Sequence, residues 1–230
     1  MIGIIGAMEE EVSQLVKKMT NSEQTVIAGM VFNKGVLEGK DVVIVRSGIG
    51  KVNAAMCTQI LATYFDVKYV INTGVAGSLK NEINIGDIVI STDAMQHDMD
   101  ATGFGYEPGI IPRMKTSVFK ADERLMDIAV ESCKVAVPQI GVFKGRVVSG
   151  DQFITDKNIK ERLIKLFDGY CTEMEGAAIA QAAFLNDIPY LVIRAISDKA
   201  DDSASMDYGE FERKAIDNSV ALMCEMIGRI

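Results

Sequence analysis

The groups in this sequence that are best suited to chemistry are carboxylates at the ends of predicted strands and helices. Three consecutive glutamates at 9–11 follow the first apolar segment, Glu175 precedes an alanine-rich segment, and Asp198 follows a long apolar one. The chain has a single histidine, His97, and no tryptophan. Serine–histidine triads and histidine-rich metal sites therefore have almost no basis here, and acid–base catalysis would fall to carboxyl groups.

Each of these acids also has an ordinary structural explanation. Negative charge at a helix N-terminus accounts for the first two glutamates of 9–11. The third, Glu11, points about 100° away from its neighbour on a helix and can face a cleft. An acid of the segment 173–175 can likewise cap the alanine-rich helix that follows. Arg194 lies within the apolar segment that precedes Asp198, and a buried arginine needs an acidic partner, for which Glu175 and Asp198 are both candidates.

Taken together, the acids indicate one kind of reaction. Cleavage of a glycosidic bond uses one acid to protonate the leaving group and a second to activate water, and it does not need histidine. Glu11, Glu175 and Asp198 all lie at the ends of elements that a parallel sheet gathers on one edge. We therefore predict that the three side chains converge on one ligand.

Short apolar, β-branched segments alternate with helical patterns, which predicts an α/β fold. We predict strands at 2–6, 25–29, 31–37, 42–47, 69–72, 88–91, 140–149 and 190–196. We predict helices at 9–19, 50–64, 121–133, 157–166, 175–185 and 208–227. Neither a repeat nor a linker interrupts the 230 residues, so we expect one domain over residues 1–230.

Two glycine-rich segments match nucleotide-binding loops only in part. Residues 47–52 lack the first glycine and the final serine or threonine of a phosphate-binding loop, and Gly48 and Gly50 lack the third glycine of a dinucleotide fingerprint. Binding of a nucleoside triphosphate or of NAD is therefore disfavoured. Residues 72–78 are small and follow a predicted strand, which indicates either a tight turn or a close approach of the backbone to a ligand.

The longest predicted loop covers residues 100–116. It contains three glycines and two prolines, together with the apolar side chains of Phe104, Tyr106, Ile110 and Ile111. A loop of this length within a compact domain is usually functional or disordered, and this one is too apolar for disorder. We expect it to cover a pocket, that of a neighbouring subunit being the natural candidate.

Composition limits the partners of the chain. Its net charge of −8, from 32 acidic and 24 scattered basic residues, argues against nucleic acid but would tolerate a nucleoside without phosphates. The four cysteines form neither a CxxC pair nor a zinc-site spacing, and we expect reduced thiols. The first residues lack the pattern of a signal peptide, and no apolar run approaches the length of a membrane span. We therefore expect a cytoplasmic protein without membrane association.

Five segments, in this order, carry a family resemblance. They are 3–11 (GIIGAMEEE), 47–52 (SGIGKV), 149–154 (SGDQFI), 173–175 (EME) and 194–198 (RAISD). Together they closely resemble the bacterial 5′-methylthioadenosine/S-adenosylhomocysteine nucleosidases, and the resemblance runs from Met1 to the C-terminal helix. It implies a nucleoside phosphorylase-like, three-layer α/β/α sandwich around a twisted mixed sheet, working as a homodimer without metal or cofactor. The implied reaction hydrolyses the N-glycosidic bond of both nucleosides, releasing adenine in methionine salvage.

The resemblance also assigns roles to the matching positions. Asp198 would donate a proton to N7 of adenine, Glu11 would hold and deprotonate the attacking water, and Glu175 would bind the ribose hydroxyls. The other implied contacts are Phe153 and the backbone of Ile154 at the base, Met174 at the ribose, Met8, Ile49 and Tyr208 around the 5′-alkylthio group, and Val75, Ala76, Gly77, Arg194 and Ser197 along the border. The partner subunit would complete the 5′ pocket with Ala101, Phe104 and Pro112.

The sequence departs from the family pattern at three places and leaves rival functions open. Val75 stands where many relatives have serine, and Thr172 and Gly176 stand where valine and alanine are frequent, which bears on the preference between the two nucleosides. The nearest rival is a purine nucleoside phosphorylase, although residues 8–11 offer acids where phosphate needs cations. The others are nucleosidases for 5′-deoxyadenosine or futalosine-type nucleosides, a non-catalytic nucleoside-binding module, which would not need the paired acids, and a structural subunit.

Overall fold

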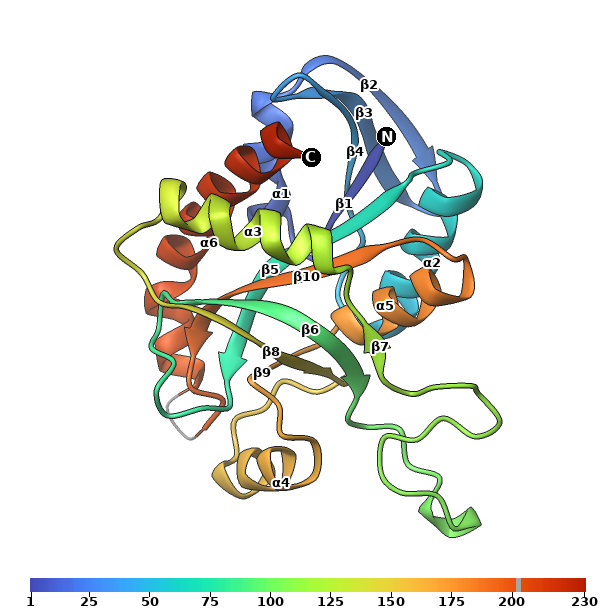
Figure 1. Cartoon of the computed structure of the whole chain (residues 1–230), viewed down its shortest axis with the longest axis vertical. Coiled ribbons are helices and arrows are strands. Elements are labelled where there is room, and N and C mark those ends of the chain that lie inside the picture. The colour runs from blue at the N-terminus through green and yellow to red at the C-terminus, as the bar shows by residue number, and fades with distance from the viewer. Residues whose placement is uncertain (202–203) are drawn as a thin grey trace.

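Four parallel strands form the centre of the sheet and end at one edge (Figure 1). The computed structural model describes residues 1–201 and 204–230, without the side chains of 205–210 and 212. Every residue in the first and last of the four strands along the chain is buried, as expected for parallel strands that helices cover on both faces. In spatial order the four are β10 (Tyr190–Asp198), β5 (Tyr69–Ser78), β1 (Ile2–Gly6) and β4 (Lys40–Arg46).

The other strands pair in both parallel and antiparallel directions, which makes the sheet mixed. In one half of the sheet they close a ring of strands. They are β2 (Thr20–Ile27), β3 (Met30–Leu37), β6 (Ile88–Gln96), β7 (Phe119–Lys120), β8 (Val142–Ser149) and β9 (Cys171–Glu173). β10 pairs with β6, β6 with β8, β8 with β9 and β9 with β5, which pairs back with β10, so five strands form a barrel-like ring. The antiparallel pair β2–β3 extends the sheet from β4, and β7 pairs with β6.

Helices cover both faces of the sheet and produce three layers. They are α1 (Glu9–Lys18), α2 (Lys51–Thr63), α3 (Glu123–Ala136), α4 (Lys157–Phe167), α5 (Gly176–Leu185) and α6 (Ala204–Arg229). α1, α3 and α6 pack together on one face, and α2 packs with α5 on the other (Figure 1). Among the described residues, none of the helices combines the length and the apolar character that crossing a membrane requires.

The structure differs from the predicted elements in two ways: β2, β5 and β6 extend five or six residues beyond the predicted strands at one end, and two short strands are added. β5 continues to Ser78, so the small residues at 72–78 belong to a strand and not to a tight turn. The physical reason is that β5 is paired along this stretch with β10 and, at its end, with β9. β9 and β7, with three and two residues, were not predicted, because segments so short carry no periodicity.

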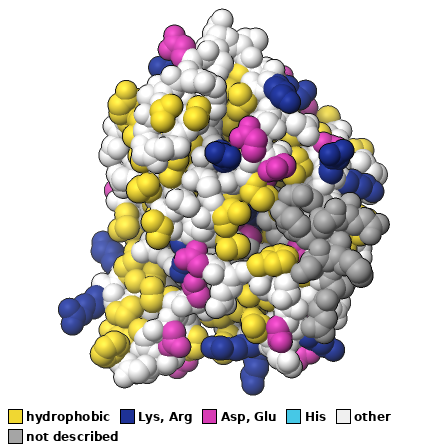
Figure 2. All heavy atoms as spheres, turned by 180° about the vertical axis from the view of Figure 1, so that it is seen from behind, with side chains coloured by type: hydrophobic (Ala, Val, Ile, Leu, Met, Phe, Trp, Pro, Cys, Tyr) yellow, Lys and Arg dark blue, Asp and Glu magenta, His cyan; other side chains and the backbone are white. Residues whose placement is uncertain are grey.

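The molecular surface agrees with the scattered charge pattern of the sequence. On the face shown in Figure 2, Lys and Arg side chains stand singly or in small groups among acidic and apolar side chains. With a net charge of −8 over the whole chain, the described side chains on this face form no continuous basic strip for a phosphate backbone.

Candidate active site

A cavity of about 340 Å³ opens at the carboxyl edge of β1, β5 and β10. The three acids singled out from the sequence, Glu11, Glu175 and Asp198, all line it. The rest of the wall is largely apolar and consists of Ala7, Met8, Ile49, Val75, Ala76, Gly77, Phe153 and Met174, with Thr172, Glu173 and Ser197. The fold therefore places three carboxyl groups from distant parts of the sequence against one mainly apolar cavity.

Glu11 faces the cavity from the first turn of α1 and is only 4% exposed. Its Oε2 accepts hydrogen bonds from the amides of Ala7 at 2.7 Å and Met8 at 3.0 Å, and its Oε1 accepts one from the amide of Val75 at 3.2 Å. Burial raises the pKa of the Glu11 carboxyl, while the positive charge of Arg194 and these amides oppose the rise. A buried carboxyl group held in one orientation, with a raised pKa, is suited to act as a base.

Two glycines of β5 make room for the reactive side chains. A Cβ atom at Gly74 would overlap the Arg194 guanidinium and the Glu11 carboxylate. A Cβ atom at Gly77 would overlap the Asp198 carboxylate. Glycine inside a strand often marks a close approach of another group, and here the groups are the acids of the cavity and the arginine beside them.

Asp198 is the last residue of β10 and is 1% exposed. Its Oδ1 accepts a hydrogen bond from the amide of Ala200 at 2.8 Å, and its Oδ2 accepts one from the Ser197 hydroxyl at 2.9 Å. Asp198 lies opposite Gly77 of β5, whereas Glu11 contacts the β5 backbone two residues earlier. Two residues of strand span about 7 Å at the usual rise of about 3.3 Å per residue. The two acids thus stand at separate points along the cavity wall.

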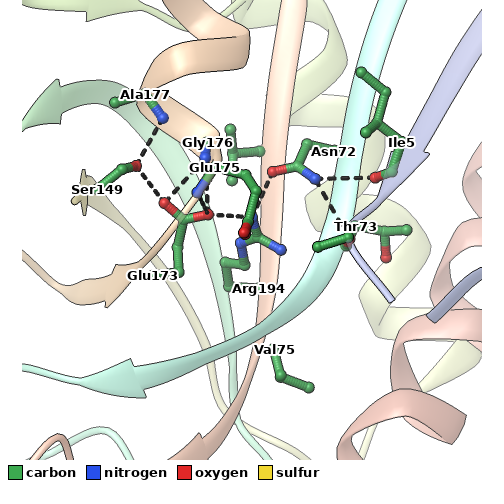
Figure 3. A network of polar contacts seen from close by, with 12 residues as sticks. Ile5, Asn72, Thr73, Val75, Ser149, Glu173, Glu175, Gly176, Ala177 and Arg194 are labelled. Carbon is green, nitrogen blue, oxygen red and sulfur yellow. Dashed lines mark hydrogen bonds and ion pairs between the residues drawn. The ribbon is translucent and has the colours of Figure 1, made fainter. Parts of the chain in front are cut away.

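Arg194, which the resemblance placed at the border of the site, is not among the described residues that line the cavity. It contacts one that does, Glu173, within a network of buried polar groups (Figure 3). Arg194 is 1% exposed, and its Nη2 donates to the side-chain oxygen of Asn72 at 2.6 Å and pairs with Glu173. The Glu175 carboxylate is more distant, at 3.7 Å. The sequence pointed to Glu175 or Asp198 as the partner of this arginine. Glu175 does form an ion pair with it, but the closer and hydrogen-bonded partner is Glu173, which the unpredicted strand β9 brings to the same place.

Glu173 also caps helix α5 (Figure 3). Its carboxylate accepts the amide hydrogens of Glu175 at 3.2 Å and of Gly176 at 2.8 Å, and it also accepts the Ser149 hydroxyl. Glu175 is the N-cap residue of α5, yet its own side chain makes no capping hydrogen bond. The capping expected of an acid in this motif is therefore confirmed, and the acid that provides it is Glu173 and not Glu175.

Glu175 is consequently available to the cavity. Its Oε1 accepts a hydrogen bond from the amide of Gly50 at 2.9 Å, at the start of α2. Burial, followed by the nearby charge of Glu173, raises the pKa of Glu175 to about 7, against the opposing effects of Arg194 and the Gly50 amide. Glu175 therefore changes between its neutral and charged forms near neutral pH, which is typical of functional carboxyl groups.

Known proteins of one family match the whole chain. The model of the phosphorylase superfamily matches residues 1–228. The 5′-methylthioadenosine/S-adenosylhomocysteine nucleosidase of Halalkalibacterium halodurans is 43% identical over 231 residues, a match that covers 100% of this chain and 98% of the relative. The chain belongs to the phosphorylase superfamily and to this nucleosidase family.

Solved structures of the nucleosidase family have the same fold. The enzyme of Neisseria meningitidis, in complex with methylthio-immucillin-A, has a TM-score of 0.95 and 36% identity, covering 100% of this chain and 99% of that one. The enzyme of Colwellia psychrerythraea 34H, in complex with adenine, has a TM-score of 0.95 and 41% identity, covering 99% of this chain and 94% of that one. These matches confirm the predicted α/β/α fold of the nucleosidase family.

Most of the contact residues that the nucleosidase resemblance named lie at the cavity. The ones that line it are Met8, Ile49, Val75, Ala76, Gly77, Phe153, Met174 and Ser197. The Ile154 side chain instead packs in a separate apolar cluster with Leu163 and Phe167, so any contact with a ligand falls to its backbone. The side chain of Tyr208 lies outside the described residues.

The loop at 100–116 is irregular, as predicted, apart from one 3₁₀ turn at Thr102–Phe104. Ala101, Phe104 and Pro112 are not among the described residues that line the cavity of their own chain. Phe104 is 86% exposed, more than any other large apolar side chain among the described residues. The role of these three residues in a partner subunit stays a prediction.

Three residues that line the cavity had no role assigned from the sequence: Ala7, Thr172 and Glu173. The available signal was the motifs themselves, since Ala7 and Glu173 belong to recognised motifs and Thr172 directly precedes one. The role of Glu173 was hidden because Glu173 and Arg194 come together only through β9 and β10. Within the described parts of the chain, no group of three or more His, Cys, Asp or Glu side chains is arranged to hold a metal ion.

Proposed function

We propose that this chain hydrolyses the N-glycosidic bond of 5′-methylthioadenosine and S-adenosylhomocysteine and releases adenine and the 5-thio-substituted ribose. The observation that carries the proposal is the convergence of Glu11, Glu175 and Asp198 on one mainly apolar cavity. Membership of the nucleosidase family supports the same reaction. In the proposed cleavage one acid protonates the leaving group, a second activates water and a third stabilises the charge on the sugar.

Asp198 protonates the leaving group. Adenine leaves poorly as an anion, so a proton delivered to N7 during bond breaking lowers the barrier. Asp198 lies at the carboxyl end of β10 next to Gly77 and Ser197, and Phe153 lines the same cavity and offers a ring on which the purine can stack. The bond from the Ser197 hydroxyl fixes the Asp198 carboxyl in one orientation, which favours directed proton transfer.

Glu11 binds and deprotonates the attacking water. Three backbone amides hold its two oxygens, and the remaining lone pairs can accept a hydrogen bond from a water between Glu11 and the anomeric carbon. As the C–N bond breaks, Glu11 takes the proton of that water. General acid and base assistance of this kind typically contributes about 10²- to 10⁴-fold for each group.

Glu175 serves the sugar. The sugar becomes positively charged in an oxocarbenium-like transition state, and an ionised carboxylate in a site with little water stabilises that charge. Because the pKa of Glu175 is raised to about 7, an approaching positive charge favours its ionised form. Its carboxylate also offers acceptors for the ribose hydroxyls.

Hydrolysis is favoured over phosphorolysis by the charge of the cavity. Glu11, Glu173 and Glu175 all line it, and the nearby cation, Arg194, is buried and already bonded to Glu173 and Asn72. A phosphate dianion would meet this acidic wall, and none of the described residues that line the cavity is a lysine or an arginine that could hold it. Water is uncharged and meets no such barrier.

We also infer that residues 1–230 act as one cytoplasmic domain and as a homodimer. Ile49 and Phe153, at the cavity, are 53% and 52% exposed, and Phe104 is exposed on the loop at 100–116. Exposed apolar side chains of this kind gain stability when a second subunit covers them. The partner's loop, through its Ala101, Phe104 and Pro112, would then complete the wall around the 5′ group.

The test is adenine release in phosphate-free buffer from methylthioadenosine, S-adenosylhomocysteine and inosine, assayed side by side. We expect release of base from the first two nucleosides without added phosphate, and little from inosine. A strict requirement for added phosphate would show a phosphorylase, and preferred cleavage of inosine would show a different base specificity. The dimer is tested separately by sedimentation equilibrium.

A further inference from the structure

A second cavity, of about 560 Å³, adjoins the active-site cavity along the same edge of the sheet. The two cavities share Ala7, Met8 and Ile49 as walls. The second one continues past β1 to the end of β4 and the turn between β2 and β3, where Gly29 and Arg46 contribute to its lining. We call this second cavity the β4 groove.

The order of groups along this edge gives the β4 groove its position relative to the substrate. Asp198 lies at β10, at the purine end in the proposed function, and Glu11 lies next, held by the amides of Ala7 and Met8 at the end of β1. In the sheet, Gly6 at the end of β1 is paired with Arg46 at the end of β4. The β4 groove therefore begins on the side of the sugar that points away from the purine.

The β4 groove also carries charges of both signs. Arg46 is the one Lys or Arg among the described residues that line it, and Glu9 and Glu10 line it as well. The closest approach between the Arg46 guanidinium and the Glu9 carboxylate is 3.9 Å, and both side chains are more than half exposed. This pair is too long for a hydrogen bond, so it leaves the guanidinium able to bind a carboxylate.

The two proposed substrates differ only beyond the 5′ sulfur. Methylthioadenosine ends there in a methyl group, whereas S-adenosylhomocysteine continues through a three-carbon chain to an α-ammonium and an α-carboxylate. We propose that the β4 groove binds this amino-acid end, with Arg46 pairing with the carboxylate and Glu9 and Glu10 facing the ammonium. The inference rests on the proposed function and makes Arg46 a residue that determines specificity for the larger substrate.

The experiment compares three substrates in four proteins. The substrates are methylthioadenosine, S-adenosylhomocysteine and 5′-n-butylthioadenosine, an uncharged analogue that extends beyond the sulfur. The proteins are the wild type and the variants Arg46→Gln, Arg46→Lys and Lys34→Gln. Lys34 is exposed on β3 and does not line the β4 groove as the structure describes it, so its replacement is a matched control for the loss of one positive charge.

We expect Arg46→Gln to raise KM for S-adenosylhomocysteine by about three- to tenfold, the range for one partly exposed charge-assisted contact. KM for the two uncharged substrates should stay unchanged, Arg46→Lys should restore most of the loss, and Lys34→Gln should behave as wild type. An unchanged KM for S-adenosylhomocysteine, or an equal rise for all three substrates, overturns the inference while leaving the proposed function intact. Failure of the wild type to cleave any of the three overturns the proposed function itself.

Discussion

Replacement of Glu173 by glutamine tests the division of labour between Glu173 and Glu175. The Glu173 carboxylate pairs with Arg194, caps α5 and accepts the Ser149 hydroxyl. Glutamine keeps the shape and one oxygen for the helix amides, but it removes the negative charge. The variant therefore separates the electrostatic role of Glu173 from its role as a helix cap.

The loss of stability can be worked from the geometry of the pair. The side chains of Arg194 and Glu173 are 1% and 3% exposed, and removing one partner of a buried ion pair costs about 3–5 kcal/mol. Glu175, at 3.7 Å, still compensates part of the Arg194 charge, so we expect the lower end, about 3 kcal/mol. At about 2–4 °C per kcal/mol for a chain of this size, Tm should fall by about 6–12 °C.

The structure also predicts the direction in which the pH dependence of kcat/KM should shift in this variant. Burial and then the charge of Glu173 raise the pKa of Glu175 to about 7. If ionised Glu175 stabilises the cationic sugar, kcat/KM of the wild type should rise with pH through about 7 and then level off. Without the Glu173 charge the pKa of Glu175 falls, so the rising part of the pH profile, its acid limb, should move to lower pH.

The raised pKa of Glu175 also affects stability. Glu175 favours folding at low pH, and this contribution is lost as pH rises from 4.5 to about 7.

The assay is kcat/KM for methylthioadenosine between about pH 5 and 9, with Tm measured by circular dichroism at each pH. Assays are run well below the lowered Tm, so that loss of fold is distinguished from loss of catalysis. Glu173→Asp is the matched control, because it keeps the charge and should keep the acid limb in place. An acid limb that stays put or moves to higher pH in a folded Glu173→Gln protein would refute the reasoning.

Three further predictions concern the walls of the cavity. Glu11→Gln and Asp198→Asn should each fold normally and lose about 10²- to 10⁴-fold in kcat. A wild-type rate in either variant would show that the replaced acid does not have the role proposed for it. Gly74→Ala should lower the free energy of unfolding, measured in urea, by about 1–3 kcal/mol, because the new Cβ overlaps the buried Arg194 and Glu11 side chains. The control is Gly103→Ala, which has open space around it and should leave the free energy of unfolding nearly unchanged. Phe153→Ala should raise KM for every adenine nucleoside by about ten- to a hundredfold through lost stacking, with Tm nearly unchanged because the ring is half exposed; an effect on only one substrate would contradict a stacking role.

The sequence determined the features that depend on local patterns. The alternation of apolar strands with amphipathic helices predicted the α/β class, and the limits of β1 and α1 were predicted within one residue. The small residues at 72–78 misled the prediction of β5, because glycine and serine favour turns, while pairing with neighbouring strands holds this segment extended. The recognised motifs led to the family and its fold, both of which the comparisons confirm.

Only the tertiary structure decided which acid does which structural work. Glu173 and Glu175 stand two positions apart at the start of one helix, and nothing in their sequence neighbourhood separates them. The fold turns Glu173 towards Arg194 and the amides of α5, and it turns Glu175 towards Gly50 and the cavity. The pKa of a carboxyl group depends on burial and on charges within a few ångströms, and these neighbours come from strands and helices that are remote in sequence. Residue type could therefore be read from the chain, but the charge state and the role of each acid required its three-dimensional surroundings.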